Sequence, residues 1–70
     1  MMYEISITLK DDSVTNRYYF RNRDEMYDKG FSDKISDMLS GMMVSSLVSV
    51  GVVCTYELDD GTYLTCRRMN

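Results

Sequence analysis

The sequence predicts an α+β domain, in which a four-stranded, mainly antiparallel sheet carries one helix packed across one face. Four segments alternate apolar with polar side chains, as half-buried strands do: residues 3–10, 14–21, 48–58 and 62–69. Between the second and third segments, apolar residues recur every three or four positions, which is typical of an amphipathic helix. A chain of 70 residues has room for one domain, spanning 1–70, in the order strand, strand, helix, strand, strand.

The first two segments form a predicted hairpin. Tyr3 to Lys10 alternates apolar with polar side chains and is expected to be a half-buried strand. Asp11-Asp12-Ser13 is a polar turn, because its short side chains can bond the local backbone. Val14 to Arg21 returns as the second strand. Tyr18 and Phe20 lie on the more apolar of its two faces, so we expect them to point towards the core.

Asn22 and Glu25 mark the expected start of the helix, in the manner of a capping box. The apolar stripe that follows predicts a single helix over 23–43, bent at Gly30. The alternative is a first helix that ends at Gly30 and a second one capped by Ser32. Residues 41–46 either extend the helix or lead into the third strand. The stripe consists of Tyr27, Phe31, Ile35, Met38, Leu39 and Met42.

The last two segments, from Val48 to Met69, form a second predicted hairpin. Asp59-Asp60-Gly61 suits a three-residue loop, with a type I turn followed by glycine in the left-handed region. A two-residue Asp60-Gly61 turn would bury less apolar area, so we expect the three-residue loop. The resulting pairs share the face under the helix: Leu58 with Thr62, Tyr56 with Leu64, and Cys54 with Cys66.

The sequence offers no recognisable catalytic or metal-binding group. Cys54 and Cys66 would face each other at a hydrogen-bonded position, which suits a disulfide poorly, so we expect two reduced, buried thiols. They also lack metal-ligand spacing. Histidine is absent, and the four glycines match no phosphate-binding loop. We therefore expect no enzymatic activity, no cofactor and no metal.

The formal net charge of -3 does not favour attraction to nucleic acid or to an anionic membrane, whereas it suits a basic protein partner. No apolar run approaches the ~20 residues needed to span a bilayer. The amino terminus lacks the pattern of a signal peptide, so we expect a cytoplasmic protein.

Two surfaces are candidates for binding a partner, although each is also typical of an ordinary solvated face. Carboxylates on the polar side of the helix could imitate a phosphate backbone: Asp24, Glu25, Asp28, Asp33 and Asp37. Arginine and tyrosine on the open sheet face suit a protein hot spot, or could stack bases and hold phosphates. These sheet residues are Arg17, Tyr19, Arg21, Tyr63 and Arg67.

In size, negative charge and compact sheet-plus-helix layout, the chain resembles the small acidic inhibitors that phages encode against host defences, including anti-CRISPR proteins. The resemblance is one of overall type and carries over no functional residue. It implies steric or charge-mimicking blockade of a nucleic-acid-handling complex in the host cytoplasm.

Two alternatives accompany that hypothesis. The first is a single-stranded nucleic-acid-binding module that uses the open sheet face. The second is a homodimer formed through an exposed edge strand, Thr62 to Met69, and through the methionines of the helix. Those methionines are Met26, Met38, Met42 and Met43.

Overall fold

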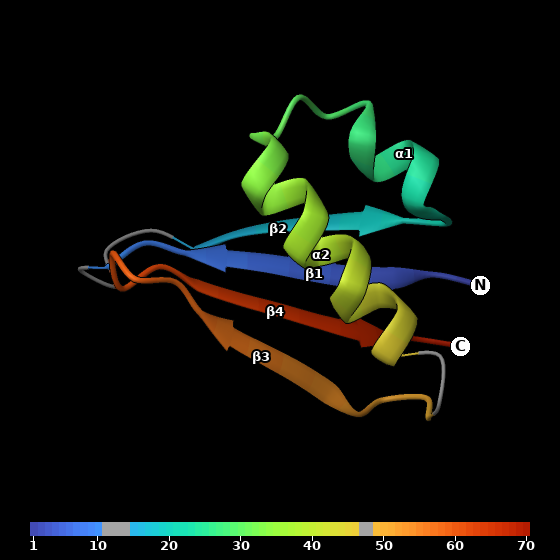
Figure 1. The fold of residues 1–70 in the computed structure, drawn as a ribbon. Coiled ribbons are helices and arrows are strands. Elements are labelled where there is room, and N and C mark those ends of the chain that lie inside the picture. The colour runs from blue at the N-terminus through green and yellow to red at the C-terminus, as the bar shows by residue number, and fades with distance from the viewer. Residues whose placement is uncertain (11–14, 47–48) are drawn as a thin grey trace.

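A computed structural model describes residues 1–10, 15–46 and 49–70, and it confirms the predicted α+β class. One antiparallel sheet has the strand order β2-β1-β4-β3, and the helices lie on one of its faces (Figure 1). The predicted turn at 11–13 lies outside the described residues. The elements are β1 (Tyr3–Thr8), β2 (Thr15–Phe20), α1 (Arg23–Tyr27), α2 (Asp33–Ser45), β3 (Val53–Glu57) and β4 (Tyr63–Arg68).

The single predicted helix is wrong, and the alternative of two helices is confirmed. Gly30 has a φ of 77°, in the left-handed region, which an α-helix cannot continue through. Ser32 then caps α2, because its hydroxyl accepts a hydrogen bond from the Ile35 N–H at 3.3 Å. Tyr27 consequently leaves the expected apolar stripe and is exposed, while its neighbour Met26 is fully buried.

The capping box at the start of α1 is present in a shifted form. The Asn22 side chain accepts from the Glu25 N–H at 3.0 Å, as predicted. The Glu25 carboxylate reaches back to the N–H of Arg21 at 2.8 Å, one residue before the cap. At the far end of the helical layer, residues 41–45 extend α2, and Ser46 is its C-cap.

The register of the second hairpin agrees with the prediction. Cys54 lies opposite Cys66 and Tyr56 opposite Leu64. The Leu58 N–H donates to the Thr62 carbonyl at 2.8 Å, and Gly61 has a φ of 87°, as a three-residue loop requires. The predicted start of this hairpin at Val48 is wrong, because β3 begins at Val53. Gly51, with a φ of 82°, turns the chain just before it.

The core lies between the helices and one face of the sheet. Tyr18 and Phe20 face it as predicted, and both rings contact Phe31, from the segment that joins α1 to α2. Methionines fill much of the remaining space: Met26, Met42 and Met43 are buried. Met26 and Met43 therefore belong to the core and are not available for the predicted dimer surface, whereas Met38 is only partly buried and lines a groove with Met42.

The prediction that Thr62 to Met69 is an exposed edge is also wrong. β4 lies between β1 and β3 and pairs with both (Figure 1). The edges of the sheet are β2 and β3. The sequence could not reveal this arrangement, because the order of strands along the chain does not show which strand of a hairpin lies inside the sheet and which lies at its edge.

Candidate interaction surfaces

The open face of the sheet carries a carboxylate on one of its two inner strands. Glu4 of β1 lies opposite Tyr19 on β2 and opposite Arg67 on β4. Its two oxygens accept from both neighbours, from the Tyr19 hydroxyl at 2.9 Å and from Arg67 Nε at 3.0 Å. The Tyr19 hydrogen bond and then Arg67 hold the pKa of Glu4 below its ordinary value of 4.5, while the same bond raises the pKa of Tyr19.

The rest of this face is polar and close to neutral. In the next cross-strand row, Ser6 lies opposite both Arg17 and Thr65, and the hydroxyls of Ser6 and Thr65 are hydrogen-bonded. Tyr63 lies a row further on, opposite Thr8 and Glu57. The described strand residues that point to this side carry two arginines and two glutamates: Arg17, Arg67, Glu4 and Glu57.

This arrangement bears on the proposed contact with nucleic acid. Tyr19 and Arg67, two of the side chains expected to stack bases or hold phosphates, both bind Glu4. A phosphate reaching Arg67 would be repelled by that carboxylate, which already accepts from the guanidinium Nε. The geometry therefore makes the open face a weaker phosphate site than the sequence alone indicates.

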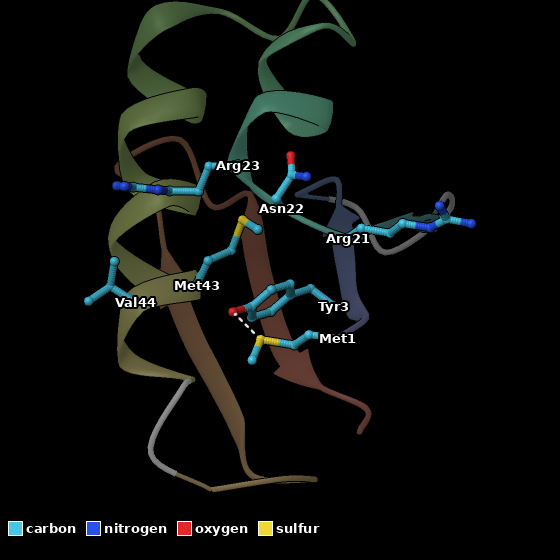
Figure 2. Close-up of a pocket in the computed structure, with 7 residues that line it drawn as sticks. All are labelled: Met1, Tyr3, Arg21, Asn22, Arg23, Met43 and Val44. Carbon is cyan, nitrogen blue, oxygen red and sulfur yellow. Dashed lines mark hydrogen bonds between the residues drawn. The ribbon is translucent and has the colours of Figure 1, made fainter.

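Arg21 does not join the cluster around Glu4. It follows the end of β2 and lines a hollow at the start of α1, together with Tyr3 and Arg23. Figure 2 shows the side chains of Arg21 and Arg23 extending in opposite directions. Arg23 Nη1 donates to Ser40 Oγ at 3.2 Å, which ties α1 to α2. The two guanidinium groups therefore do not converge on a common ligand. The other residues around the hollow are Met1, Asn22, Met43 and Val44.

The acidic residues of the helical layer are all exposed, but they do not form one row. The break at Gly30 places the first three on α1 and at its C-cap, and Asp33 and Asp37 on α2. Glu25 has a structural role, because its carboxylate accepts from the Arg21 N–H. Within the described residues, no hydrogen bond or ion pair engages the carboxylates of the other four: Asp24, Asp28, Asp33 and Asp37.

A groove between α2 and β3 is a feature that the sequence analysis missed. Its apolar lining includes Met38, Met42, Cys54 and Tyr56, and Asp37 stands at its border. Tyr56 points to the same side of the sheet as Leu58 but remains 50% exposed, because β3 is the outermost strand next to α2. The alternation of β3 showed which face Tyr56 would occupy, but not that the helix would leave this strand partly uncovered.

The two cysteines are free thiols that face each other beneath α2. The Ser46 hydroxyl lies 3.7 Å from Cys54 Sγ and 3.5 Å from Cys66 Sγ. Burial, with a smaller contribution from Cys54, raises the pKa of the Cys66 thiol. Cys66 is therefore poorly suited to act as a nucleophile at neutral pH.

Comparison with known proteins identifies no relative: no family model, no curated protein and no solved structure matches the chain. In the part of the chain that the structure describes, no helix is long and apolar enough to cross a membrane. The same residues contain no group of three or more acidic, cysteine or histidine side chains placed to hold a metal ion.

Proposed function

We propose that this protein is a non-enzymatic binding protein that inhibits or modulates a basic, nucleic-acid-handling partner, in the manner of anti-CRISPR and other anti-defence proteins. One observation carries the proposal. The helical layer presents four exposed carboxylates that have no hydrogen-bond or ion-pair partner among residues 1–10, 15–46 and 49–70, in a chain whose net charge is -3. Such a layer is complementary to a groove of lysine and arginine that normally holds a phosphate backbone.

The open sheet face supports a protein partner better than a nucleic acid. Its arginines are balanced by glutamates, and Glu4 accepts from both Arg67 Nε and the Tyr19 hydroxyl. Tyrosine and arginine remain suitable as contacts to a protein, where both residue types are enriched at hot spots. We assign this face the role of a second contact, through Arg17, Tyr63 and the exposed side of Tyr19.

The test compares two variants that change the net charge equally. Asp28→Asn/Asp33→Asn removes two carboxylates from the helical layer at nearly constant side-chain volume. Asn16→Lys/Ser49→Lys adds two positive charges at exposed positions outside that layer. Tagged wild type and both variants are used to capture proteins from a bacterial lysate, with washes from about 50 mM to about 200 mM salt, the range over which phosphate-like contacts weaken steeply.

The proposal predicts that wild type and the lysine variant retain one nucleic-acid-handling complex, that salt releases it, and that the asparagine variant fails to retain it. Equal retention by all three proteins would show that the acidic layer is not the contact. A gel shift with short RNA and DNA at low salt tests the nucleic-acid alternative in parallel. We expect no shift, and a clear shift would favour the sheet-face nucleic-acid module instead.

A further inference from the structure

In the part of the chain that the structure describes, no strand pairs with the outer edge of β3, and exposed apolar side chains gather there. Val50, Val52, Val53 and Tyr56 lie on or just before this strand, and each is between 50% and 57% exposed. β3 contains no lysine, arginine or proline, which are the residues that natural proteins place on edge strands to prevent pairing. The opposite edge differs, because β2 has Arg17 near its middle and contacts α1.

The register of β3 against β4 shows which N–H and C=O groups of β3 point away from β4. The bond from the Leu58 N–H to the Thr62 carbonyl marks a hydrogen-bonded pair, and such pairs alternate along an antiparallel ladder. Cys54 and Tyr56 therefore direct their backbone groups towards β4. Val53, Thr55 and Glu57 direct theirs to the free edge.

We propose that β3 pairs with β3 of a second copy of this chain, antiparallel, about a twofold axis that passes beside Thr55. In this register Thr55 lies opposite its own counterpart, and Val53 lies opposite Glu57 of the other copy. All outward N–H and C=O groups of Val53, Thr55 and Glu57 then find partners. Shifting the pairing by two residues in either direction leaves some of them unpaired.

The side chains agree with that register. Glu57 is the one charged residue of β3, and it faces a valine rather than its own counterpart, so like charges do not meet. On the helix side, Tyr56 of one copy lies beside Cys54 of the other. The half-exposed ring thus enters the groove whose lining includes Met38 and Met42. Each copy supplies both the groove and the side chain that covers it, which is the self-complementarity a twofold contact requires.

The contact is small, so the dimer is expected to be weak. A pairing of two five-residue strands falls below the ~1,200 Å² of a standard interface, and we expect dissociation in the micromolar to millimolar range. The average mass measured by light scattering or sedimentation should rise from the monomer value of 8.2 kDa towards twice that value. This rise should occur between about 5 µM and about 500 µM protein.

Three lysine variants test the register and not merely the strand. Thr55→Lys puts two ammonium groups opposite each other at the axis, and association should weaken by at least about tenfold. Val53→Lys puts a lysine opposite Glu57 on each side, and association should tighten by about fivefold, as expected for two exposed ion pairs. Asn16→Lys, on the other edge, should leave association unchanged. A generic effect of edge lysines would weaken association in Thr55→Lys and Val53→Lys alike and would overturn the register.

Amide hydrogen exchange in the wild type gives a readout that does not depend on any variant folding. Raising the protein concentration should slow exchange at Val53, Thr55 and Glu57, while Cys54 and Tyr56 are already protected by β4. A protein that stays monomeric at all these concentrations overturns the proposal. So does a dimer in which the added protection falls on β2.

Discussion

The break between α1 and α2 can be tested with one substitution made at two glycines. Gly30 has a φ of 77°, whereas Gly41 lies inside α2 and has no positive φ. A Cβ added at either position would meet nothing within 4 Å. The two sites therefore differ in backbone conformation and not in available space, so alanine should act with opposite sign at each.

The expected magnitudes follow from the backbone alone. Gly41→Ala should raise the free energy of unfolding by about 1 kcal/mol, the difference in helix propensity between the two residues. At Gly30, alanine in the left-handed region costs about 1–2 kcal/mol. Alanine also restricts the unfolded chain, and this loss of conformational entropy offsets about 0.4–1 kcal/mol of that cost. Gly30→Ala should thus lower the free energy of unfolding by roughly 1 kcal/mol.

Urea and thermal unfolding followed by circular dichroism measure both variants against wild type. A difference of roughly 2 kcal/mol between them corresponds to roughly 8–16 °C in midpoint for a chain of this size. Similar m-values would show that the unfolded states are comparable. A continuous helix over 23–43 would make both alanines stabilising, so an increase in stability with Gly30→Ala would refute the break.

Three further outcomes are expected. In the folded protein the Tyr19 hydroxyl lowers the pKa of Glu4, and the Thr62 N–H lowers the pKa of Asp60. The two ionised carboxylates therefore stabilise the fold at pH values above their ordinary pKa values of 4.5 and 3.8. This stabilisation should be lost as the pH falls through the folded values, and acid titrations of unfolding should show a shallower loss in Glu4→Gln than in wild type. Leu64→Ala, at a fully buried position, should cost about 2–5 kcal/mol in urea unfolding, and a smaller loss would contradict its place in the core. In thiol-labelling kinetics, Cys54→Ala should leave Cys66 to react slowly and Cys66→Ala should leave a faster Cys54, because burial raises the pKa of Cys66; equal rates would contradict this.

The local features of the sheet could be predicted from the sequence because they depend on neighbouring residues. Side-chain alternation placed Tyr18 and Phe20 in the core, and the chemistry of Asp59-Asp60-Gly61 set the pairing of Cys54 with Cys66. The start of β3 was predicted too early because the alternation of valines continues through Gly51. That glycine turns the backbone without interrupting the pattern of side chains.

The features that were missed depend on contacts between distant segments. Helical spacing continues across Gly30, so the apolar stripe could not show that the chain turns there. The position of β4 between β1 and β3 is a matter of topology, and it moved the exposed edge from β4 to β3. The engagement of Glu4 with Tyr19 and Arg67 likewise requires knowing that β1 lies between β2 and β4. Each of these points changed the assignment of a candidate surface.

The two proposals reinforce each other through the geometry of the pairing. A twofold axis that joins two β3 strands in one sheet is perpendicular to that sheet, so both helical layers lie on the same side of the dimer. The acidic groups of the two copies would then face one partner together, and binding the second layer would follow at high effective concentration. A basic partner with two suitable grooves should therefore bind wild type more tightly than Thr55→Lys, even though that substitution lies outside the acidic layer. Equal affinity of the two proteins would show that binding of the partner requires only the monomer.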